Sequence, residues 1–261
     1  MNAGLHVLGR SGPMDGNAIL AKGDFTTYGT SHRVVLVLLV IVACWMVWYG
    51  RRVRGTPAAD RLSRGYALVF AALTLPWQIR YLAPDTFTLY NSLPIDLCDL
   101  AWMAALYALF TYRRWAVALT YYWGLTLTVQ AVITPDLGSA FPDPRFILYW
   151  AMHGGTVVAA IYLTWGLGLT PDWRSYRIAV VVTAVWAAAA YVFNEIADTN
   201  YGFLNAKPST ASILDLFGPW PWYVLVEIGL ISAGWALITW PWVSRARPAG
   251  AGRRRRRRAV G

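Results

Sequence analysis

The sequence predicts an all-helical membrane protein, a single bundle of seven transmembrane helices. Of its 261 residues, 57% are hydrophobic and only 14% are charged, with a mean hydropathy of +0.41. Water-soluble domains carry roughly 25% charged and about 45–50% apolar residues. Several apolar runs also reach the roughly 20 residues that a helix needs to cross a bilayer. None of them alternates apolar and polar residues as a barrel strand does, so the spans are predicted to be helices.

The apolar runs account for nearly the whole middle of the chain. Each is long enough for one crossing of the membrane at a rise of about 1.5 Å per residue. No internal repeat or second domain interrupts them, so we expect one membrane domain at residues 31–244. In chain order, the expected spans are Arg33–Tyr49, Leu62–Ile79, Ile95–Tyr112, Trp115–Ile133, Phe146–Leu169, Arg177–Ala197 and Trp222–Val243.

The two ends of the chain are predicted to lie outside this domain. Residues 1–30 lack the basic and apolar regions of a cleavable signal, and we expect a disordered or weakly ordered tail. Residues 245–261 form a basic tail whose run Arg253–Arg258 explains most of the net charge of +10. Because this run follows the last span and contains no aromatic residues, we expect it to anchor the topology and attract anionic lipid rather than nucleic acid.

The arginines predict the orientation of the bundle. Cytoplasmic loops of membrane proteins collect Lys and Arg. With the N-terminus outside, most of the 23 basic residues fall on the cytoplasmic side. The prediction is therefore an outer N-terminus and a cytoplasmic C-terminus, in the plasma membrane. The basic residues of the inner segments are Arg51, Arg52, Arg54, Arg61, Arg64, Arg113, Arg114, Arg174, Arg177, Arg245, Arg247 and Arg253–Arg258.

Polar residues of the expected spans gather in the outer half of the membrane. Ionisable groups inside spans are costly and usually face the bundle interior or a water-filled cavity. We therefore predict one pocket that opens outward. In the alternative reading, acids near helix ends only reach the head-group region and His153 only bonds a neighbouring helix. The candidate residues are His32, Asp96, Cys98, Asp99, Gln130, His153, Asn194, Glu195 and Glu227.

The surroundings of Cys98 suggest a nucleophile. Asp96 and Asp99 share a helix face at the N-terminal end of their span, where the helix dipole favours negative charge. Cys98 lies near the same positive end, which favours a thiolate. A Cys98–His153 pair would need a carboxylate, Glu227 or Asp99, to orient the imidazole. A metal site built from these acids and His153 is chemically allowed but has no spacing signature, so neither a metal nor a cofactor is expected.

The long loop before the last span offers further substrate contacts. It places Asn200, Tyr201 and Lys207 on the predicted outer side, where Lys207 would meet a lipid phosphate if the loop were a lid. The alternative is an ordered loop fixed by Trp220 and Trp222, because aromatic residues are common at membrane surfaces.

The chain resembles the bacterial YwaF-like integral membrane proteins from Phe25 to Val243. Through them it is distantly similar to a eukaryotic phospholipid acyltransferase that acts through a cysteine and a histidine. The resemblance implies Cys98 as the acyl-carrying nucleophile and His153 as the base, with His32 as a competing base. The chain departs from the pattern at Asp96, where many relatives have a histidine. The matching stretches are "FTTYGTSH" (25–32), "LPIDLCDLAW" (93–102), "VQAVITPDL" (129–137), "MHGG" (152–155), "TNYGFLNAKP" (199–208) and "ILDLFGPWPWY" (213–223).

These observations lead to a main hypothesis and two alternatives. The main hypothesis is a lipid-directed acyltransferase or ester hydrolase that uses Cys98 and His153, with a membrane phospholipid or fatty-acyl substrate. One alternative is a transporter of small molecules or ions that uses the outer cavity, with Glu227 as a proton or cation site. The other is a sensor or scaffold whose polar residues only specify helix packing. A transporter needs polar residues that continue toward the cytoplasm, and the inner halves of the spans contain few.

Overall fold

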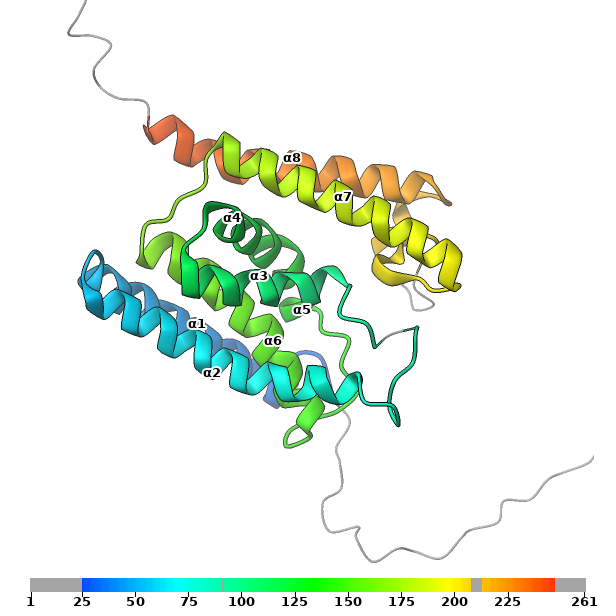
Figure 1. Ribbon diagram of the computed structural model, residues 1–261, viewed down its shortest axis with the longest axis horizontal. Coiled ribbons are helices and arrows are strands. Elements are labelled where there is room, and N and C mark those ends of the chain that lie inside the picture. Colours follow the sequence, from blue (N-terminus) through cyan, green and yellow to red (C-terminus); the bar gives the residue numbers. More distant parts are fainter. Residues whose placement is uncertain (1–24, 91, 208–212, 247–261) are drawn as a thin grey trace, which may run out of the picture.

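The computed structural model describes residues 25–90, 92–207 and 213–246, and these residues contain helices and no β-strand. Every expected span coincides with a helix (Figure 1). The tails 1–24 and 247–261, including Arg253–Arg258, lie outside the described residues. The helices are α1 (Thr30–Val53), α2 (Pro57–Tyr81), α3 (Leu97–Thr111), α4 (Arg114–Tyr122) continued by η1 (Trp123–Leu127) and α5 (Thr128–Ile133), α6 (Pro144–Ile161) continued by η2 (Tyr162–Gly166), α7 (Trp173–Ala197) and α8 (Trp222–Ala246).

The bundle has two deeply buried central rods, α4–η1–α5 and α6–η2, and several less buried helices around them. Helices α1 and α2 lie together on one side and α7 and α8 on the other, with α3, α4 and α6 between them (Figure 1). In the most apolar stretch of the α4–η1–α5 rod, 61% of the residues are buried, and in the α6–η2 rod 56% are. The corresponding shares in α1, α7 and α8 are 17%, 11% and 17%. The peripheral helices therefore turn apolar side chains outward, as helices in contact with lipid do.

Five of the helical rods are long and apolar enough to cross a membrane, and α2 and α3 are not among them. Helix α3 has 15 residues and therefore extends about 22 Å, less than the roughly 30 Å of a hydrocarbon core. The expected span Ile95–Tyr112 begins too early, because Asp96 has an extended backbone and the helix starts at Leu97. This shortened helix leaves room beside its N-terminus for the polar segment that precedes it.

The two central rods each contain a π-helical turn, η1 and η2, which the sequence pattern does not predict. A π turn is rare and usually marks a local packing or functional demand. The rods meet at Gly124 of η1, where an added Cβ would lie 3.0 Å from the Ala160 Cβ. Glycine therefore permits this close contact, and a side chain here would need its neighbours to shift by a few tenths of an ångström.

Helix α6 approaches α1 and α2 closely at two adjacent glycines. A Cβ at Gly154 would lie 2.6 Å from a methyl group of Leu39 on α1. A Cβ at Gly155 would lie 2.8 Å from the ring of Phe70 on α2. The Tyr66 hydroxyl also donates a hydrogen bond to the Gly155 carbonyl. Small residues that let backbones approach are common at helix contacts in membranes.

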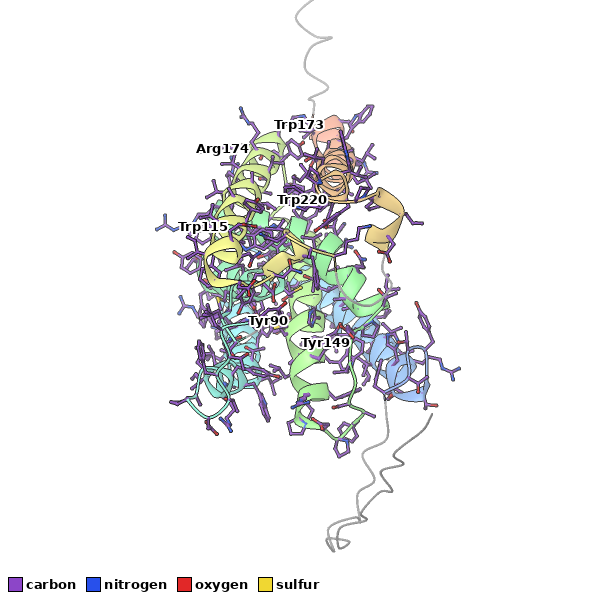
Figure 2. All side chains as sticks on the ribbon, turned by 90° about the vertical axis from the view of Figure 1, so that its right-hand side faces the viewer. Tyr90, Trp115, Tyr149, Trp173, Arg174 and Trp220 are labelled. Atoms are coloured by element: carbon purple, nitrogen blue, oxygen red, sulfur yellow. The ribbon has the colours of Figure 1, made fainter. Side chains whose placement is uncertain are left out.

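The ends of the bundle carry exposed aromatic side chains. Tyr90 and Trp220 lie at the end that faces the viewer in Figure 2, and Trp115 and Trp173 begin their helices at the other end. The connections α1–α2, α3–α4 and α6–α7 share that second end (Figure 1). Aromatic residues at both ends are typical of a protein that crosses a bilayer.

Cysteine labelling would test the predicted orientation. In a chain in which Cys44 and Cys98 are replaced by alanine, Lys207→Cys is expected to react with a membrane-impermeant maleimide added to intact cells. Arg113→Cys, which lies at the opposite end of the bundle, is expected to react only after permeabilisation. The reverse pattern would show that the arginine distribution has been read the wrong way round.

Candidate functional site

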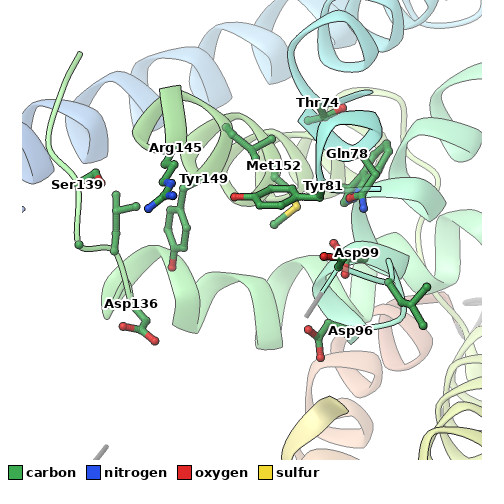
Figure 3. Close-up of a pocket in the computed structure, with 16 residues that line it drawn as sticks. Thr74, Gln78, Tyr81, Asp96, Asp99, Asp136, Ser139, Arg145, Tyr149 and Met152 are labelled. Atoms are coloured by element: carbon green, nitrogen blue, oxygen red, sulfur yellow. The ribbon is translucent and has the colours of Figure 1, made fainter. Parts of the chain in front are cut away.

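A polar pocket of about 370 Å³ opens at the end of the bundle where α2 ends and α3 begins. Its walls come from α2, α6, the segment before α3, and the loop after α5 (Figure 3). Trp102 also lines the pocket and belongs to the main apolar core, so one part of the pocket lining is continuous with that core. Its polar and charged lining residues are Thr74, Gln78, Tyr81, Ser92, Asp96, Asp99, Asp136, Ser139, Arg145 and Tyr149.

The start of α3 supplies two of the carboxylates. Asp96 occupies the position just before the helix, and its Oδ1 accepts a hydrogen bond from the Gly202 N–H at 3.1 Å. Asp99 lies one turn further and lines the same pocket. Residues three apart share a helix face, so the spacing of these acids brings both to one wall. In Figure 3 they lie together, away from Arg145.

Helix α6 and the loop before it supply the opposite wall. Arg145 and Tyr149 lie one turn apart on α6, and Asp136 extends from the loop below them (Figure 3). Tyr149 also donates a hydrogen bond to the Ala131 carbonyl at 2.8 Å. The sequence reasoning missed these three residues. The spacing of 145, 149, 152 and 153 is that of one helix face and was a usable signal.

His153 is buried directly behind the pocket wall. Its ring lies 4.2 Å from the Tyr149 ring, centroid to centroid, and its Nδ1 lies 2.9 Å from the Tyr149 carbonyl oxygen. A carbonyl only accepts, so Nδ1 carries the proton of the neutral imidazole and Nε2 carries the lone pair. A backbone carbonyl thus orients this ring, where the sequence reasoning expected a carboxylate.

His32 has both ring nitrogens engaged. Its Nδ1 accepts from the Tyr28 N–H at 2.9 Å, which places the proton on Nε2, and Nε2 donates to the Val132 carbonyl at 3.0 Å. The ring is fully buried between Phe25, Tyr28 and Trp150. It therefore has no lone pair to accept a proton, and its position connects α1 with the end of α5.

Cys98 is half-buried on the first turn of α3 and does not line the pocket. Its thiol lies within electrostatic range of Asp96, Asp99 and the Tyr149 hydroxyl. Of these groups, Tyr149 is the one whose ring also packs against the His153 ring. Cys44, in contrast, lies on an exposed face of α1 in the middle of that helix.

The predicted residues at the end of α7 form a separate structural cluster. Asn194 is buried, and both lone pairs and both N–H groups of its amide are used. Its Oδ1 accepts from Thr199 Oγ1 and Tyr201 N, and its Nδ2 donates to Tyr201 O and Asn205 Oδ1. Asn205 also donates to Glu195. None of these side chains lines the pocket.

The same loop supports the pocket wall from behind. The Tyr201 hydroxyl donates to the Leu89 carbonyl at 2.8 Å and accepts from the Leu93 N–H at 3.2 Å. Leu93 lines the pocket, so this bond positions one of its walls. Among the described residues, Asn200 binds its own loop, through the backbone of Asn205 and Ala206.

The remaining predicted residues lie away from the pocket. Lys207 pairs with Asp215 at 3.7 Å, and its Nζ lies 5.5 Å above the Tyr223 ring. Glu227 is half-buried on α8, one turn after Tyr223, and does not line the pocket. The side chain of Gln130 is exposed. Within the described residues, no group of three or more His, Cys, Asp or Glu side chains is arranged to hold a metal ion.

The fold and the pocket define a class: an all-helical, multi-pass integral membrane protein with a polar pocket at one end of its bundle. Residues 27–239 match the TMEM164 family, and the chain belongs to this family. No curated protein and no solved structure matches the chain. The assignment to the YwaF-like bacterial proteins is therefore wrong, because the matching family is of a eukaryotic type.

Proposed function

We propose that this protein acts on lipid esters, as an acyltransferase or hydrolase, with Cys98 as nucleophile and His153 as base. The observation that carries the proposal is the tautomer of His153. The bond from Nδ1 to the Tyr149 carbonyl leaves the Nε2 lone pair available, whereas both nitrogens of His32 are occupied. The proposal therefore keeps His153 and drops His32 as the base.

The reaction would proceed in two steps. As the Cys98 sulfur attacks the ester carbonyl, its proton passes to Nε2 of His153. The C–S bond forms, the C–O bond breaks, and the leaving alkoxide takes the proton back from His153. A water molecule or a second lipid hydroxyl then attacks the thioester. This attack releases a fatty acid or a new ester and restores the thiol.

The pocket beside these residues suits a zwitterionic head group. The carboxylates Asp96 and Asp99 on one wall would attract an ammonium group, and Arg145 on the other would bind a phosphate (Figure 3). The apolar core that borders the pocket at Trp102 weighs against continuous transport through the bundle, which needs a polar path. We place the pocket on the outer face of the plasma membrane, following the arginine distribution.

Thiol labelling tests the assignment of the nucleophile. In Cys44→Ala protein, a long-chain alkyl iodoacetamide is expected to label Cys98, and His153→Gln is expected to slow the reaction about tenfold or more, because a neighbouring base raises the thiolate fraction. Cys98→Ala protein, which retains Cys44, is the control for labelling from the lipid phase. Equal labelling rates with and without His153 would refute the proposed pair.

A further inference from the structure

The opposite end of the bundle contains a second cavity, and one of its walls is formed by Arg51 in the last turn of α1 and Arg54 just after that helix. Arg51 Nε donates to the Trp165 carbonyl at 3.0 Å. Arg54 donates through Nε and Nη2 to the Gly166 carbonyl at 3.2 and 3.0 Å. These carbonyls end the η2 turn and have no partner further along the helix, so the guanidinium groups cap them.

The fold makes specific room for these arginines. Gly50 of α1 lies so close to η2 that an added Cβ would be 3.1 Å from the Gly166 Cα. Gly168 has a φ of +75°, and a Cβ there would lie 2.6 Å from the Arg54 guanidinium. The glycine at position 168 therefore allows both the left-handed turn and the position of Arg54.

The positive charge of this site has no counter-charge in the described part of the chain. A bond to a neutral carbonyl satisfies a donor but leaves the charge of the guanidinium in place. Neither Arg51 nor Arg54 forms an ion pair within the described residues. Asp60 lines an adjoining cavity together with Arg54 but does not pair with it. Both arginines retain N–H groups for a further acceptor.

The cavity itself measures about 430 Å³, and one residue of its lining has a hydroxyl without a hydrogen-bond partner among the described residues. Its lining comprises Arg51, Arg54, Thr164, Trp165, Gly168, Thr170 and Trp242. Thr164 is only 1% exposed, and its hydroxyl has no hydrogen-bond partner among the described residues. A buried polar group without a partner is uncommon in proteins. The hydroxyl oxygen is closed off from the cavity in this structure, so a ligand there would reach it after rotation of the Thr164 side chain.

We infer that this cavity binds a phosphate group, held by the guanidinium groups of Arg51 and Arg54 and by the Thr164 hydroxyl. Planar guanidinium groups match phosphate oxygens in shape and charge. Trp165 and Trp242 border the cavity at the end of the bundle, and tryptophans at bundle ends are common where a membrane protein meets lipid head groups. The phosphate belongs either to an anionic lipid or to a soluble phosphate compound, and the two sources require different tests.

The lipid test uses the full chain in nanodiscs of phosphatidylcholine with and without phosphatidic acid. Native mass spectrometry should show that phosphatidic acid is retained by the wild type. The Arg51→Gln/Arg54→Gln variant should lose this retention by about tenfold or more. The matched control is Arg61→Gln/Arg174→Gln, which removes the same charge from exposed positions at the same end. Equal loss in both variants would overturn the inference, because general attraction to the membrane surface would then suffice.

The soluble source has its own measurement. Inorganic phosphate is added to wild-type protein in phosphatidylcholine discs, and its melting temperature is followed. A rise that disappears in Arg51→Gln/Arg54→Gln identifies a soluble phosphate compound, and retention of phosphatidic acid alone identifies a lipid. The absence of both effects would overturn the inference.

The Thr164→Val variant keeps the inference testable if the arginine variants fail to fold. The change conserves shape and removes a hydroxyl without a partner, so the protein is expected to fold with an undiminished melting temperature. Phosphate or phosphatidic acid binding should nevertheless weaken several-fold. Arg51→Lys/Arg54→Lys, which keeps the charge but loses the planar fork, should also bind more weakly. Unchanged binding in both variants would exclude the proposed contacts.

Discussion

His153→Gln is expected to lower lipid-ester turnover about 10²-fold or more while leaving the melting temperature nearly unchanged. The expected loss is the usual scale for removing a general base. The effect on stability is small because the only hydrogen bond of the ring within the described residues goes to a carbonyl of its own helix, Tyr149 O. Turnover is measured by mass spectrometry of lipids in nanodiscs, and stability by thermal unfolding of the same samples.

His32→Gln is the matched control on the other buried histidine. This change breaks the bonds with Tyr28 N and Val132 O in a fully buried site. Each buried group left without a partner costs about 1–3 kcal/mol. We therefore expect a clear drop in melting temperature with unchanged turnover per folded molecule. If His32→Gln instead stops turnover and His153→Gln only destabilises, the two roles are assigned the wrong way round.

Asn194→Leu is expected to lower the free energy of unfolding by roughly 3 kcal/mol or more. Leucine fills a similar volume but leaves Thr199 Oγ1, the Tyr201 N–H and carbonyl, and the Asn205 amide without their partner. Thr199 and Tyr201 are buried. Loss of the Asn194 contacts should therefore also loosen the bond from Tyr201 to the pocket wall. Unfolding in increasing concentrations of a denaturing detergent measures the effect.

Two further variants provide comparisons for the loss of stability in Asn194→Leu. Asn194→Asp keeps an acceptor for Thr199 and Tyr201 but loses both N–H donors, so its destabilisation should fall between the wild type and Asn194→Leu. Gln130→Leu replaces an exposed amide on α5 and should change stability by less than about 0.5 kcal/mol. Similar effects of Asn194→Leu and Gln130→Leu would mean that the loop is not held by this amide.

Hydropathy was sufficient to locate the helices, because length and apolar composition alone decide whether a segment can cross a membrane. All expected spans coincide with helices, although α2 and α3 are less apolar or shorter than a full span. The π turns were not predictable in this way. They depend on how Gly124 and Ala160 meet between two helices, and a contact of this kind leaves no periodic signal within either helix.

The candidate site was harder to predict, because chemically identical residues differ only in their partners. The sequence placed His32 and His153 in the same outer layer, and only the acceptors around each ring distinguish them. Asp96 and Asp99 reached the pocket as their spacing predicts. Glu227 was grouped with them by depth in the membrane, but depth does not specify the direction in which a helix faces. Arg145 was overlooked because it begins its helix and was counted only as a loop charge.

The two adjacent glycines of α6 also affect which substitutions this sequence can accept over evolutionary time. A larger residue at Gly154 would displace the methyl groups at the flexible end of Leu39, whereas one at Gly155 would meet the buried ring of Phe70, so a change at Gly155 favours a second change on α2. Outward-facing positions such as Val185, which surrounding acyl chains can accommodate, carry no such condition. Substitutions on the outer faces can therefore become fixed one at a time, whereas a substitution at Gly155 is favoured by a compensating change in the helix that it contacts.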